Sequence, residues 1–88
     1  MPHPSGFSLQ VINFVRSRLR EADADLSGRY LATHTTMSSS YARERLIRAK
    51  PFNTEDIEQL STLFGYPSPR DFVAAVIDAD PLKDEFGA

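Results

Sequence analysis

Apolar residues recur along the chain at the three- and four-residue spacing of amphipathic helices. The first series, Ile12, Val15 and Leu19, predicts a helix over about 8–22. Later segments with the same spacing predict four more helices, at about 27–34, 39–49, 54–64 and 69–79. No segment shows the strict alternation of a half-buried strand. The pattern therefore predicts an all-α fold with five short helices.

Local end signals support the boundaries of the last two predicted helices. Asn53 followed by Asp56 resembles a reciprocal capping arrangement, and Gly65 supplies a left-handed residue that ends a helix. Ser68 precedes Pro69. Proline is favourable as the first helical residue, because a backbone N–H at that position would have no partner within the helix. These signals predict one helix that ends near Gly65 and another that begins at Pro69.

The apolar faces of the five predicted helices define an expected core. Its members are spread over all five helices, as a single bundle core requires. We expect the following residues to be buried together: Ile12, Val15, Leu19, Leu31, Ala32, Leu46, Ile57, Leu60, Phe64, Phe72 and Val76.

The 88 residues fit one domain with two short extensions. Residues 1–7 contain prolines and small polar residues and are predicted to form a flexible arm. The domain is expected over 8–80, followed by an acidic tail over 81–88.

Composition excludes several kinds of protein. The chain has no cysteine, so it has neither disulfides nor thiolate metal sites, and its only histidines are His3 and His34. The apolar runs are too short to span a membrane, and the first residues lack the pattern of a signal peptide. We therefore expect a cytoplasmic protein without a metal, cofactor, small-molecule ligand or membrane partner.

The charges of the chain are distributed unevenly. The net charge is −2, yet residues 1–50 hold eight Lys and Arg against four Asp and Glu. Residues 51–88 hold two Lys and Arg against eight Asp and Glu. Such a division indicates a face that binds a polyanion beside an acidic half that faces solvent or a partner.

The second and third predicted helices are the most informative segment for function. Thr33, Thr35 and Thr36 weaken the end of the second helix and favour a turn there. Ser38 is a natural N-cap for the third helix, which begins with small polar residues and carries arginines. Two short helices joined by a tight turn, the second of them basic, are the layout of a helix-turn-helix motif.

Three stretches extend this pattern to a resemblance with a known family. They are LSGRYLA, MSSSYARERL and NTEDIEQLSTLFGYPSPRDF, and with the first helix they cover about 8–77. This part of the chain resembles the Cro- and lambda-repressor-type helix-turn-helix regulators of phages and bacteria. The resemblance implies a transcriptional regulator or repressor that inserts its third helix into the major groove of double-stranded DNA. It also implies a symmetric homodimer, for which the fifth helix and the tail would provide the surface.

The same resemblance assigns candidate contact residues. The base-contacting face of the third helix would carry Ser39, Ser40, Arg43 and Glu44. Arg29 lies where the family contacts a phosphate or an edge base, and Arg48 and Lys50 lie near the loop that contacts the DNA backbone.

The sequence offers no case for an enzyme. It contains neither a Gly-rich phosphate loop nor a G-x-S-x-G motif. The acids near the C-terminus are better explained as a solvated face than as a metal site. They are Asp78, Asp80, Asp84 and Glu85.

The alternative function is a protein-interaction module, such as an antitoxin or adaptor, built on the same fold. The acidic second half of the chain favours it. Salt dependence separates the two functions, because neutralising phosphates makes affinity fall steeply with salt. A DNA-binding protein should also present its cations on one exposed face, namely Arg29, Arg43, Arg48 and Lys50.

Overall fold

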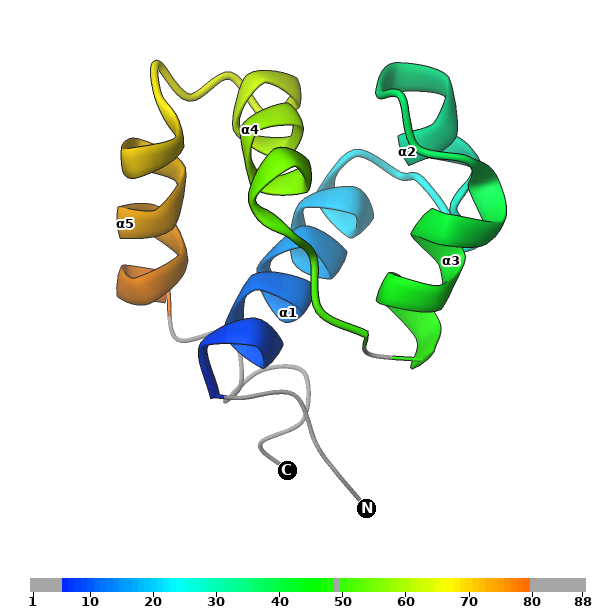
Figure 1. Cartoon of the computed structure of the whole chain (residues 1–88), viewed down its shortest axis with the longest axis horizontal. Coiled ribbons are helices and arrows are strands. Elements are labelled where there is room, and N and C mark those ends of the chain that lie inside the picture. Colours follow the sequence, from blue (N-terminus) through cyan, green and yellow to red (C-terminus); the bar gives the residue numbers. More distant parts are fainter. Residues whose placement is uncertain (1–5, 49, 80–88) are drawn as a thin grey trace.

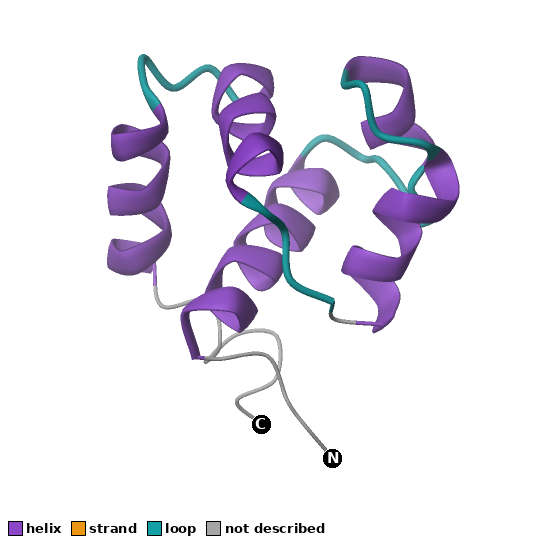
Figure 2. Ribbon diagram, in the orientation of Figure 1, coloured by secondary structure: helices purple, strands orange, loops and turns teal. Residues whose placement is uncertain are grey.

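In the computed structural model of the protein, residues 6–48 and 50–79 are described, and they form five α-helices and no strand (Figures 1 and 2). The helices are α1 (Gly6–Glu21), α2 (Arg29–His34), α3 (Ser39–Arg48), α4 (Thr54–Leu63) and α5 (Pro69–Ala79). The all-α fold predicted from the apolar spacing is thereby confirmed. Within the described residues, no helix is long and apolar enough to cross a membrane.

The first helix lies between two helix pairs (Figure 1). It packs against α5 on one side and against α3 on the other, while α4 packs on α5 and α2 packs on α3. The loops that join successive helices are short (Figure 2). As a result, α2 and α3 lie together at one edge of the molecule, on the side away from α5.

The two predicted helix starts in the first third of the chain need correction. α1 begins at Gly6, so residues 6 and 7 are helical and do not belong to a flexible arm. α2 begins at Arg29, two residues later than predicted, because its N-cap is Gly28 in a left-handed conformation with φ +95°. The rest of the predicted arm and the predicted tail lie outside the described residues.

The end signals of the last two helices form as predicted. The Asn53 side chain accepts a hydrogen bond from the Asp56 backbone N–H at 2.8 Å, and the Asp56 carboxylate accepts from the Asn53 N–H at 3.0 Å. Gly65 follows α4 with φ +84°. The Ser68 hydroxyl accepts from the Asp71 N–H at 3.3 Å and donates to its carboxylate at 2.9 Å.

The buried core matches most of the predicted set. Eight of its members have at most 1% of their surface exposed, namely Ile12, Val15, Leu19, Leu31, Leu46, Leu60, Phe72 and Val76. Ala32, Ile57 and Phe64 are only partly buried, because a chain of this length has few residues to cover the outer sides of α2 and α4. Val11, Phe14, Met37 and Ala42 complete the buried apolar set.

Asn13 is an exception within this apolar interior. Its side chain is fully buried in α1, between Ile12 and Phe14, and neither its amide nitrogen nor its amide oxygen has a hydrogen-bond partner among the described residues. A buried polar atom without a partner costs about 1–3 kcal/mol of stability. Asn13 therefore lowers the free energy of unfolding.

We expect Asn13→Leu to raise the free energy of unfolding by about 1–3 kcal/mol, because leucine has nearly the same shape without the unpaired polar atoms. Urea denaturation followed by circular dichroism measures the change. Ser17→Leu, at a partly exposed position of the same helix, controls for added apolar volume. A destabilised Asn13→Leu variant would contradict this assignment.

Candidate functional site

The connection between α2 and α3 is a four-residue turn, 35–38, held by side-chain hydrogen bonds. The Thr35 hydroxyl donates to the Leu31 carbonyl at 2.5 Å and accepts from the Met37 N–H at 3.1 Å. The Thr36 N–H donates to the Gln59 side chain on α4 at 2.7 Å. With the Met37 side chain buried, the turn is fixed both to the core and to α4.

The start of α2 lies directly against the backbone of α3 at Gly28. A Cβ atom at Gly28 would lie 2.3 Å from the Ser39 carbonyl oxygen and 2.7 Å from the Arg43 backbone nitrogen. No side chain fits there, and the positive φ of Gly28 also favours glycine. This glycine sets the distance between the two helices.

The two sides of α3 have opposite character. Ala42 and Leu46 are completely or almost completely buried and attach the helix to the core. On the outer side, the side chains of Ser40, Arg43, Glu44 and Ile47 line a shallow hollow. The start of the helix is capped as predicted, because the Ser38 hydroxyl accepts a hydrogen bond from the Tyr41 N–H at 3.1 Å.

A second hollow lies between the start of α2 and the first part of α3. It is lined by hydroxyl groups and two cations, from Ser27, Arg29, Ser39, Ser40 and Arg43. Both arginines are exposed, and neither guanidinium forms an ion pair or a hydrogen bond within the described part of the chain. The hollow is therefore basic and rich in hydrogen-bond donors.

Asp25 lies at the approach to this basic hollow. Its carboxylate accepts hydrogen bonds from the Ser27 hydroxyl at 2.7 Å and from the Ser27 N–H at 3.1 Å. These two bonds, followed by the nearby charge of Arg29, lower the pKa of Asp25. The ionised carboxylate holds Ser27 at the start of α2, where the Ser27 hydroxyl accepts from the Arg29 N–H at 3.3 Å.

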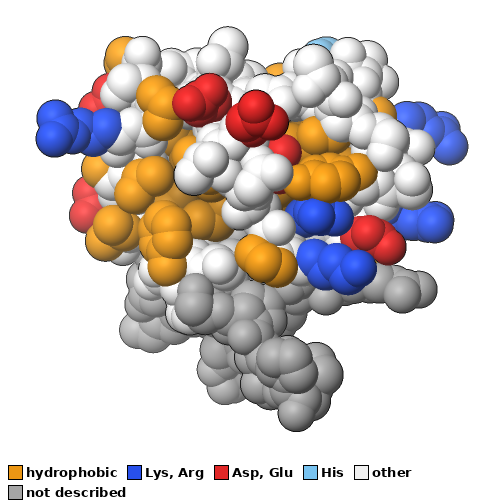
Figure 3. Space-filling model, in the orientation of Figure 1, with side chains coloured by type: hydrophobic (Ala, Val, Ile, Leu, Met, Phe, Trp, Pro, Cys, Tyr) orange, Lys and Arg blue, Asp and Glu red, His pale blue; other side chains and the backbone are white. Residues whose placement is uncertain are grey.

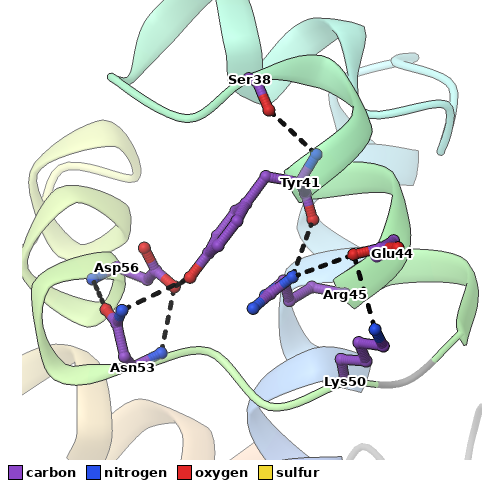
Figure 4. A network of polar contacts seen from close by, with 7 residues as sticks. All are labelled: Ser38, Tyr41, Glu44, Arg45, Lys50, Asn53 and Asp56. Atoms are coloured by element: carbon purple, nitrogen blue, oxygen red, sulfur yellow. Dashed lines mark hydrogen bonds and ion pairs between the residues drawn. The ribbon is translucent and has the colours of Figure 1, made fainter.

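On its other flank, α3 is joined to α4 by a polar network (Figure 4). The Tyr41 hydroxyl donates to the Asp56 carboxylate at 2.6 Å, and Asp56 has only 4% of its surface exposed. The Arg45 guanidinium lies over the Tyr41 ring, 3.5 Å from its centre. Burial, and then the hydrogen bond to Asp56, raise the pKa of Tyr41 above its ordinary value of 10.0, so the phenol stays a proton donor into alkaline solution.

The charges on this flank largely cancel. The Glu44 carboxylate lies 3.5 Å from the Arg45 guanidinium and 3.7 Å from the Lys50 ammonium (Figure 4). In Figure 3, Lys and Arg side chains gather on the α3 side of the molecule, with an acid among them, and acids also lie over α4. The net positive charge of the site is therefore concentrated on the flank that faces α2.

The structure brings most of the predicted contact residues together. Four of them line the basic hollow, namely Arg29, Ser39, Ser40 and Arg43. Glu44 shares the outer hollow of α3, and Lys50 lies on the opposite flank in its ion pair with Glu44. Arg48 belongs to α3, but its side chain lies outside the described residues.

Three residues of this surface were not in the predicted set. Ser27 lines the basic hollow, Gly28 permits the contact of the two helices, and Ile47 lies on the outer face of α3. The glycine inside a predicted helix was the available signal for close backbone approach. For Ile47 the signal was the helical spacing, because Ala42 and Leu46 face the core and turn Ile47 away from it.

Comparisons with protein-family models, with curated proteins and with solved structures give no match for this chain. Within the described residues, no three His, Cys, Asp or Glu side chains are grouped so as to hold a metal ion. The arrangement of α2, α3 and their flanks is therefore the observation on which a functional assignment rests.

We expect Gly28→Ala to destabilise the protein by more than the cost of backbone strain alone, which is about 1–2 kcal/mol for a left-handed residue. Gly65→Ala is the matched control, because Gly65 also has a positive φ, but a Cβ atom there would meet nothing within 4 Å. Thermal and urea unfolding of both variants measure the difference. Equal losses for the two variants would show that the close approach at Gly28 costs nothing.

Tyr41→Phe should lower the free energy of unfolding by about 1–3 kcal/mol at neutral pH, because Asp56 loses a buried hydrogen-bond donor while the ring remains. Since the pKa of folded Tyr41 is raised, this contribution is fully present below the ordinary tyrosine value of 10.0. The stability contributed by the Tyr41 hydroxyl should be lost as the pH rises through the pKa of Tyr41 in the folded protein. Urea titrations of both proteins from pH 7 to 11 test this, and a pH-independent difference would contradict it.

Proposed function

We propose that the protein is a sequence-specific, double-stranded DNA-binding transcriptional regulator. In this proposal α2, the turn 35–38 and α3 form a helix-turn-helix, and α3 enters the major groove. The observation that carries the proposal is the outer face of α3. This face bears Arg43, which has no ion-pair partner among the described residues, and it adjoins a basic hollow formed with α2.

The outer side chains of α3 have the chemistry needed to contact base edges. Arg43 offers a planar pair of donors, which suits the two acceptors of guanine in the major groove. Ser40 can pair with several bases, and the carboxylate of Glu44 can accept from the amino group of cytosine. Because Ala42 and Leu46 hold the opposite side in the core, these three side chains share one direction.

The flanks of α3 have the chemistry for contacts with the DNA backbone. Arg29 and the hydroxyls of Ser27 and Ser39 lie beside Arg43 in the basic hollow and can bind a phosphate. Lys50 follows α3 with half of its side chain exposed, and it can exchange its ion pair with Glu44 for a phosphate. Arg48 is assigned to the backbone from its place in the sequence alone.

A second copy of the chain would complete a symmetric dimer. The supporting observation is Ile77, which is 56% exposed and belongs to α5, the helix on the side of the molecule away from α3 (Figure 1). Dimerisation there would place two copies of α3 on two half-sites, about 34–36 Å apart for one turn of DNA. The binding site would then be palindromic.

A protein-interaction module remains the second candidate function, and one observation favours it. Ile47 is 56% exposed on the outer face of α3, and the neighbouring Glu44 is already paired with Lys50. An apolar residue beside a neutralised pair is also suited to contact with another protein. Such binding would depend little on salt.

We expect Arg43→Ala and Arg29→Ala to weaken DNA binding in different ways. On a duplex selected from a random pool, Arg43→Ala should cost about 1–3 kcal/mol and relax the preference at one base pair. Arg29→Ala should weaken binding equally on selected and scrambled duplexes, and it should reduce the salt slope by about one unit. Fluorescence anisotropy titrations at several salt concentrations measure both effects.

Arg70→Ala is the matched control for these titrations. It removes the same charge from an exposed position on α5, away from α3, and should leave the affinity almost unchanged. If all three variants bind every duplex as the parent does, α3 does not contact DNA. Binding of a protein partner with little salt dependence would then favour the interaction module.

A further inference from the structure

Ile47 is the apolar exception on the polar outer face of α3. It exposes 56% of its surface and lines the outer hollow together with Ser40, Arg43 and Glu44. Isoleucine has no hydrogen-bonding group in its side chain, so it gains nothing from water at this position. Contact with an apolar group of a partner would remove this surface from water, which is favourable.

The position of Ile47 relative to Arg43 limits what that group can be. The two residues are four positions apart, which is about 6 Å along the helix axis, and they line the same hollow. Successive base pairs of DNA are about 3.4 Å apart. If Arg43 binds a guanine, Ile47 therefore lies over a base one or two pairs away.

The electrostatics around Ile47 permit this approach to DNA. Glu44, three residues before Ile47, carries the only described negative charge that lines this hollow. Its carboxylate is within 4 Å of both the Arg45 guanidinium and the Lys50 ammonium. The repulsion between Glu44 and the phosphates is thus offset by two cations of the same flank.

On the basis of the proposed DNA-binding function, we propose that Ile47 determines specificity by contacting the C5 methyl group of a pyrimidine. This methyl group is the apolar feature that a base presents in the major groove. The pyrimidine lies one or two base pairs from the guanine bound by Arg43. Thymine and 5-methylcytosine both carry the group, and Ile47 contacts it in either base.

The test removes single methyl groups from DNA. In a duplex selected from a random pool, each thymine of the half-site is replaced in turn by deoxyuridine, which lacks only the C5 methyl. At one position near the guanine, the parent protein should bind the deoxyuridine duplex about fourfold more weakly, the factor expected for one buried methyl-sized group. Ile47→Ala should bind the thymine duplex correspondingly weakly and should lose the discrimination between thymine and deoxyuridine.

A second arm separates the two sources of the methyl group. The thymine–adenine pair at the sensitive position is replaced by a cytosine–guanine pair, either unmethylated or with 5-methylcytosine. If methylation strengthens binding about fourfold in the parent and not in Ile47→Ala, the methyl group alone is sufficient. If only thymine gives the effect, Ile47 contacts the methyl group of thymine specifically.

Phe7→Ala is the control, because Phe7 is also an exposed apolar residue, with 42% exposure, but lies on α1, outside the proposed DNA and dimer surfaces. It should leave the ratio of the two affinities unchanged, and a melting curve checks the folding of each variant. Two results would overturn the inference and leave the proposed function standing. In one, the protein binds duplexes in a salt-dependent way, but removing any thymine methyl group leaves its affinity unchanged. In the other, Ile47→Ala still discriminates between thymine and deoxyuridine as well as the parent does. Absence of any salt-dependent duplex binding would overturn both. A loss of self-association in Ile47→Ala with unchanged methyl discrimination would overturn the inference and assign Ile47 to a protein contact.

Discussion

The orientation of α3 depends on a narrow apolar contact with the core and on one further contact at each flank of the helix. Only Ala42 and Leu46 attach the described part of this helix to the core through fully buried side chains. Two buried side chains would leave rotation about the helix axis poorly determined. The backbone contact at Gly28 restricts α3 on one flank, and the hydrogen bond from Tyr41 to Asp56 restricts it on the other. Everything proposed for the outer face depends on this restriction.

The two flanks differ in charge as well as in structure. On the α4 side, Glu44 is shared between Arg45 and Lys50, and Arg45 is further held over the Tyr41 ring. On the α2 side, neither Arg29 nor Arg43 forms an ion pair within 4 Å among the described residues, although the Asp25 carboxylate is near Arg29. The cations that hold the structure together are thus separate from those that are available to a ligand. This separation gives a polyanion a defined edge to approach, in spite of the net charge of −2.

Much of the fold could be predicted because its determinants are local. The capping of α4 by Asn53 and Asp56 involves residues three positions apart, and apolar spacing together with local end signals indicated the five helices. The start of α2 could not be predicted in the same way. Ser27 is a good capping residue by type, and its hydroxyl does accept from the Arg29 N–H. The N-cap is nevertheless Gly28, whose role depends on the distant backbone of Ser39 and Arg43.

The candidate site was predictable by residue type more than by geometry. Arginines and serines in a short helix after a turn indicate contacts with DNA, and four of the predicted residues do line one hollow. The pairing of the charged side chains could not be predicted from the sequence, because the ion pair between Glu44 and Lys50 spans the end of α3. The burial of Asn13 is likewise an outcome of tertiary packing.

The central claim is that the outer face of α3 and the adjoining start of α2 bind duplex DNA. Two-dimensional NMR of the ¹⁵N-labelled protein during titration with a selected duplex tests it most directly. We expect the backbone amide signals of Arg29 and of residues 39–47 to shift most and those of α5 away from any dimer contact to shift little. Raising the salt concentration should reverse the shifts. Shifts confined to α4 and α5, or no shifts with any duplex at low salt, would contradict it.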